Sequence, residues 1–160
     1  MATVTHPLAS NSGHALNSSQ AGQPVIAKAR LQYAANHAAG DVIRLCKWPA
    51  GHVLVDAYLE IDDLDSNGSP ELDLDIGMVD DQGTTDDPDC IIENTLVGGV
   101  AGGIVRMNSK AAMRIAAVDY DRHIAATVVT DAATLAAGEI GIVCVFLPAA
   151  PNGMDEKITL

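Results

Sequence analysis

The stretch ELDLDIGM, residues 71–78, alternates leucine and isoleucine with aspartate. A period of two is typical of a β-strand that buries one face and exposes the other. The Asn67-Gly68 pair just before it is a strong signal for a hairpin turn. The sequence therefore predicts a hairpin between this strand and HVLVDAYLEI, residues 52–61.

Strand-like segments continue on both sides of this hairpin. They lie at residues 25–34, 41–46, 112–118, 124–129 and 140–147. DCIIENTL, residues 89–96, is compatible with a short helix, because an aspartate stands at its start and apolar residues follow. The glycine-rich run 97–105 predicts a loop or a strand edge. About seven or eight short strands separated by turns predict a mainly β fold, either an antiparallel β-sandwich or a jelly-roll-like barrel.

Charge divides the chain into zones, because no Asp, Glu, Lys or Arg occurs before Lys28. We expect an extended N-terminal arm at residues 1–24, a β-sandwich domain at 25–148 and a C-terminal tail at 149–160. The arm has too few large apolar residues to fold alone. It is either a solvated tail or an extended segment that lies on a neighbouring subunit, with Val4, Leu8 and Leu16 as apolar contacts. Fully extended, it would reach about 80 Å.

Composition excludes several classes of partner. The formal net charge is −12, which disfavours both nucleic acid and the anionic surface of a membrane. No apolar run is long enough for a transmembrane helix, and no secretory signal is visible. The three cysteines show neither a CxxC nor a zinc spacing, so we expect reduced, buried thiols and synthesis in a cytosol. The core is aliphatic, since aromatic residues make up only 3% of the chain.

The run Asp63-Leu64-Asp65-Ser66-Asn67-Gly68 matches the first half of a calcium-binding loop. Oxygens at alternate positions can converge on one ion there, so Asp63, Asp65 and Asn67 are candidate metal ligands. The match then fails, because Leu74 stands where the loop requires a bidentate glutamate. A plain turn is the alternative. The second acidic cluster, residues 80–89, is expected to be a solvated loop.

No catalytic constellation is visible, so we expect a protein that is not an enzyme and that holds no cofactor beyond the calcium considered above. Neither GxSxG nor HExxH occurs. Cys90 is the one cysteine outside a long apolar run and the only candidate nucleophile. Trp48, the sole tryptophan, is either a core residue or a contact with another subunit.

Several motifs together resemble small structural proteins of tailed bacteriophages. They are GDVIRL at 40–45, PAGHVLVDA at 49–57, DDL at 62–64, LDLDIG at 72–77, DPDCI at 87–91 and AGEIGIV at 137–143. The resemblance covers about residues 40–147, and most of its motifs are strand and turn signals. It offers no catalytic residues.

The resemblance implies a capsid decoration, or cement, protein. Such a protein would bind the major capsid protein, bridge neighbouring subunits on the capsid exterior and form a homo-oligomer, a trimer or a dimer. It would be made in the host cytoplasm and end in the virion, at the capsid surface. Alternatives are another head or tail component, or a calcium- or carbohydrate-binding β-sandwich module. The scarcity of aromatic residues disfavours a sugar-binding face.

Overall fold

The computed structural model describes residues 3–5, 23–81, 86–95 and 102–149. Its strands are β1 Thr3–Thr5, β2 Val25–Tyr33, β3 Val42–Trp48, β4 His52–Ile61, β5 Asp73–Val79, β6 Asp87–Thr95, β7 Gly103–Arg106, β8 Arg122–Thr130 and β9 Gly138–Pro148. One 3-10 helix, Ala112–Arg114, lies between β7 and β8. Among the described residues, no helix is long and apolar enough to cross a membrane.

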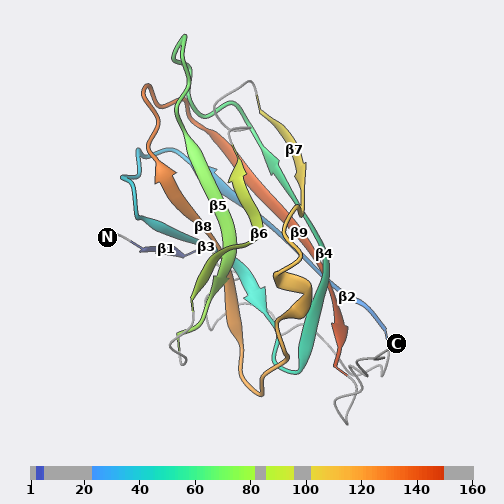
Figure 1. Ribbon diagram of the computed structural model, residues 1–160. Coiled ribbons are helices and arrows are strands. Elements are labelled where there is room, and N and C mark those ends of the chain that lie inside the picture. The colour runs from blue at the N-terminus through green and yellow to red at the C-terminus, as the bar shows by residue number, and fades with distance from the viewer. Residues whose placement is uncertain (1–2, 6–22, 82–85, 96–101, 150–160) are drawn as a thin grey trace.

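The strands form two sheets that pack face to face (Figure 1). Sheet A has the strand order β1-β3-β8-β5-β6, and sheet B has the order β2-β9-β4-β7. All the pairs are antiparallel except β1 with β3. The two sheets do not join into a closed barrel, so the predicted mainly β fold is confirmed as a β-sandwich.

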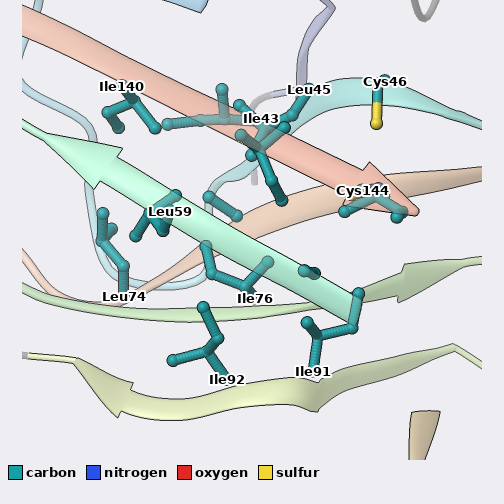
Figure 2. Close-up of a cluster of buried hydrophobic side chains, with 14 of the residues drawn as sticks. Ile43, Leu45, Cys46, Leu59, Leu74, Ile76, Ile91, Ile92, Ile140 and Cys144 are labelled. Carbon is teal, nitrogen blue, oxygen red and sulfur yellow. The ribbon is translucent and has the colours of Figure 1, made fainter. Parts of the chain in front are cut away.

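The core between the sheets is aliphatic, as the composition predicts. Figure 2 shows isoleucine and leucine side chains from β3, β4, β5, β6 and β9 meeting between the layers. Only three rings are fully buried: Tyr33, Trp48 and Phe146. Small and branched side chains allow the two sheets to approach closely over most of this interface.

Residues 89–95 of the segment 89–96 do not form the expected short helix; they belong to β6, which pairs with β5, and residue 96 lies outside the described residues. Cys90, Ile91 and Ile92 are all buried, and the β5–β6 register shifts twice, so consecutive side chains can turn inward. A short apolar run of this kind cannot be told from a helix by its periodicity.

Two further expectations are corrected. Residues 112–118 contain the 3-10 helix Ala112–Arg114 instead of a strand, and only Ala112 of that helix is buried. The Asn67-Gly68 turn does not close a hairpin, because β4 lies in sheet B and β5 in sheet A. The connection is a crossover between the sheets. Within the glycine-rich run, β7 forms an edge strand of sheet B, and residues 96–101 lie outside the described residues.

Gly77 of β5 lies very close to the backbone of the neighbouring strand β6. A Cβ there would lie 2.1 Å from the Asp87 carbonyl oxygen and 2.3 Å from the Pro88 carbonyl carbon. Both neighbours are backbone, which cannot rotate away. We predict that Gly77→Ala lowers the free energy of unfolding by about 2 kcal/mol or more, measured by urea denaturation.

Gly68→Ala is the matched control, because nothing lies within 4 Å of the Cβ it would add. It should leave the free energy of unfolding nearly unchanged. Equal stability of the two variants would contradict the close approach between Gly77 of β5 and the backbone of β6.

Candidate assembly surfaces

Asp65, one of the three candidate metal ligands, is a buried carboxylate only 1% exposed. Five backbone amides donate to it. Oδ1 accepts from Asn67 at 3.2 Å and Thr134 at 2.9 Å, and Oδ2 accepts from Glu71 at 2.9 Å, Leu72 at 3.4 Å and Ala133 at 2.9 Å. Both carboxylate oxygens are therefore occupied by donors from the protein itself.

These hydrogen bonds set the charge of Asp65. Burial raises the pKa of its carboxyl group, but the donating backbone amides lower it by more, so the pKa lies well below that of an ordinary aspartate. Asp65 is ionised at neutral pH. Its negative charge is stabilised by the dipoles of the backbone amides that donate to it.

The other two candidate ligands also accept backbone hydrogen bonds. Asp63 Oδ1 accepts from the Asp65 amide at 3.2 Å, and Asn67 Oδ1 accepts from the Ser69 amide at 2.9 Å. In the described part of the chain, no three His, Cys, Asp or Glu side chains are grouped so that they could hold a metal ion. A calcium ion at Asp63, Asp65 and Asn67 stays a prediction, and it would compete with these amides.

Trp48 occupies the core, and the expectation of a subunit contact through its side chain is corrected. It is 0% exposed, its Nε1 donates to the His52 carbonyl at 2.9 Å, and its ring lies 5.7 Å from that of Phe146. The guanidinium of Arg122 lies 4.6 Å from the Trp48 ring centroid. Burial lowers the pKa of Arg122, although nearby Asp80 opposes this.

The arm residues are placed only in part. Val4 lies in β1, where it pairs with Ile43 of β3 within the same chain. Leu8 and Leu16 lie outside the described residues. The described arm backbone therefore adds a parallel strand to one edge of sheet A.

The acidic segment 80–89 is described in part: Asp80 and Asp81 contact neighbouring side chains, residues 87–89 belong to β6, and residues 82–85 lie outside the described residues. Asp80 is 8% exposed and accepts a hydrogen bond from the Tyr120 hydroxyl at 2.8 Å. Asp81 pairs with Arg44 and lies 3.2 Å from His123 Nδ1. These acids bind back to sheet A.

Cys90 does not have the environment of a nucleophile. It is 1% exposed, and burial raises the pKa of its thiol to about 12. Cys46 and Cys144 are also buried and free. The expectation of buried thiols is confirmed for all three residues, and burial contradicts Cys90 as a nucleophile.

The outer face of sheet B is a surface that sequence reasoning missed. The pairing registers align its outward side chains in three rows: Ile26–Val145–Asp56, Lys28–Val143–Tyr58–Arg106 and Arg30–Gly141–Glu60–Ile104. Ile26 is 62% exposed and Ile104 69% exposed. In the sequence, the signal was the unbroken apolar run of β9, which places apolar residues on both faces of the sheet.

Ion pairs cross this outer face. Arg30 Nη2 lies 2.7 Å from Glu60 Oε2, above Gly141, and Arg30 Nη1 lies 3.3 Å from Glu139. On the same face, between β4 and β7, Arg106 lies 2.9 Å from Asp56 and 5.9 Å from the Tyr58 ring centroid. A groove of about 260 Å³ runs beside the Arg30–Glu60 pair to Ile104.

The class of protein that these features define is a β-sandwich with an aliphatic core. No family model matches the chain, and no curated protein matches it. Two solved structures do. A chain of the capsid of Ralstonia phage GP4 is 28% identical with a TM-score of 0.82, covering 93% of this chain and 99% of that one. A chain of the cyanophage Pam1 capsid asymmetric unit is 17% identical with a TM-score of 0.63, covering 84% of this chain and 89% of that one.

These likenesses confirm the resemblance to phage structural proteins and support a structural role in a phage capsid. The Pam1 chain shares the fold. The GP4 chain adds sequence identity over nearly its whole length.

We predict that Asp65→Asn lowers the free energy of unfolding at pH 7 by about 2–3 kcal/mol, because an amide group cannot accept from all five donors. The wild-type stabilisation is fully present above the unfolded aspartate pKa, near 3.9, and is lost as pH falls below it. The difference in the free energy of unfolding between wild type and variant should therefore become smaller at acidic pH. Urea denaturation over a pH series measures both effects.

Glu71→Gln is the matched control, because it removes one charge from an exposed side chain of the same loop. It should change stability by less than about 0.5 kcal/mol. If the two variants were equally stable at pH 7, the hydrogen bonds of Asp65 would not stabilise the β4–β5 and β8–β9 connections.

The calcium prediction has its own measurement. A bound cation stabilises the folded state, so thermal melts in calcium should show a higher melting temperature than melts in chelator. Identical melting temperatures would rule out a calcium site at Asp63, Asp65 and Asn67.

Proposed function

We propose that the protein is a capsid decoration, or cement, protein that binds the exterior of a phage capsid and bridges neighbouring major-capsid subunits. The observation that carries this proposal is the likeness to a chain of the GP4 capsid over 99% of that chain's length. Binding to the shell is its whole task in this proposal, and it catalyses no reaction.

The charge distribution favours an exterior position. A net charge of −12 keeps free subunits and decorated particles apart in solution. Asp80 accepts a hydrogen bond from the Tyr120 hydroxyl, and Asp81 lies beside Arg44 and His123 of sheet A. In the proposed arrangement sheet A faces solvent.

The arm, residues 1–24, is the proposed gripping element. Its described strand β1 is only three residues long and adds to the edge of β3. Strand addition uses backbone hydrogen bonds and therefore tolerates many sequences on the accepting edge. An extended arm can add in the same way to an edge of a major-capsid subunit, and repetition over a lattice gives avidity.

Production in the host cytoplasm fits the three free, buried thiols, since a cytosol keeps cysteines reduced. In this proposal the protein then joins the virion at its outer surface.

The arm is tested by deleting residues 1–24 and measuring co-sedimentation with phage heads that lack the protein. We predict that the intact chain binds and raises the temperature at which heads rupture, and that the deletion weakens binding at least tenfold. Deletion of residues 150–160 is the control and should bind like the intact chain.

Thermal unfolding of each truncated chain shows whether the sandwich remains folded. If a folded chain without the arm binds as tightly as the intact one, the gripping arm is wrong. If the intact chain binds purified tails but not heads, the protein is another virion component instead of a decoration protein.

A further inference from the structure

From the outer face of sheet B we infer that the protein forms a two-fold dimer in which sheet B of one copy packs on sheet B of a second copy. The dimer goes beyond the proposed function and does not depend on it. Three features of the face carry the inference: its apolar residues, its charge balance and the arrangement of its charges.

The apolar residues of the face supply surface that a second copy can bury. Val143 and Val145 lie outward on the central strand β9, and strongly exposed Ile26 lies beside Val145. Val143 is only 7% exposed, so most of the apolar surface that a partner can cover here belongs to Ile26 and Val145. Sheets that pack face to face lie about 10 Å apart, which brings such outward residues into contact.

Charge balance makes this face suited to a second copy. The chain as a whole carries −12, so most surfaces of two copies repel each other. On the outer face of sheet B the bases are Lys28, Arg30 and Arg106, and the acids are Asp56, Glu60 and Glu139. Asp62 lines the groove of the same face and adds a fourth acid, so three bases nearly balance four acids and two copies meet little net repulsion here.

The arrangement of charges selects the direction of the two-fold axis. The outward charges of β2 are the bases Lys28 and Arg30, and those of β4 are the acids Asp56 and Glu60. An axis lying between the sheets and parallel to β9 places β2 over β4 of the partner subunit. An axis perpendicular to the strands would place β2 over β2, with bases facing bases.

The favoured axis gives specific facing residues. Arg30 faces Glu60 of the partner subunit, and Lys28 faces Tyr58 of the partner subunit, where a cation can lie over the ring. Val143 and Val145 face their own counterparts. The space above Gly141 holds the Arg30–Glu60 pair of the same chain, and the groove beside that pair reaches Ile104. The interface is isologous, as most two-fold dimers are.

The first test is the oligomeric state in sedimentation equilibrium over a concentration series. We predict a dimer for the wild type and at least a tenfold larger dissociation constant for Ile26→Glu, which places an acid against Asp56 of the partner subunit. Val129→Glu is the matched control, because Val129 is also an exposed strand residue, 41% exposed, but lies on β8 of sheet A. It should dimerise like the wild type.

The second test separates contacts between copies from contacts within one copy. Arg30→Glu and Glu60→Arg each break the pair inside the chain and place like charges across the dimer, so each variant alone should be monomeric. Mixed together, the two variants place opposite charges across the interface in both halves. Native mass spectrometry should then show the heterodimer in excess over either homodimer.

Several results would overturn the dimer. They are a monomeric or trimeric wild type, an equal effect of Ile26→Glu and Val129→Glu, or no heterodimer in the mixture. A monomeric wild type whose Ile26→Glu variant fails to bind phage heads would assign this face to the capsid instead. Loss of the dimer with head binding retained would leave the proposed function intact.

Discussion

The ionised carboxylate of Asp65 is the interaction on which the sandwich depends. The chain passes from sheet B to sheet A between β4 and β5, and back between β8 and β9. A change of sheet leaves backbone amides without ladder partners, and such groups must be satisfied elsewhere. One carboxylate accepts from amides of both crossovers, so it fastens the two sheets to each other at one end of the aliphatic core.

The same residue shows what sequence reasoning could and could not find. The D-x-D-x-N-G spacing marks a loop whose side-chain oxygens, in the structure, accept hydrogen bonds from backbone amides. Peptide amides and calcium both present positive charge to such oxygens, so the motif alone does not tell which of them is bound. The deciding donors, Ala133 and Thr134, lie far along the chain, and only the fold brings them to Asp65.

The strands were predictable where alternation was clean and unpredictable where it was not. β2, β4 and β5 show an alternating or clearly bounded pattern, and the sandwich follows from them. Residues 89–95 and 112–118 are short, and their structure depends on tertiary contacts: the register shifts against β5 for the first, and a single buried residue, Ala112, for the second. The outer face of sheet B was missed because only the strand order brings the bases of β2 and the acids of β4 onto one face.

The strand order also links this face to the ends of the domain. β2 begins at Val25, which pairs with Phe146 near the end of β9, so β2 starts and β9 ends at the same end of sheet B (Figure 1). A two-fold axis parallel to the strands keeps both copies pointing in one direction, so the start of β2 and the end of β9 would lie at one end of the dimer in both copies. An axis perpendicular to the strands would place these ends at opposite ends of the dimer, and the charges of β2 and β4 favour the parallel axis.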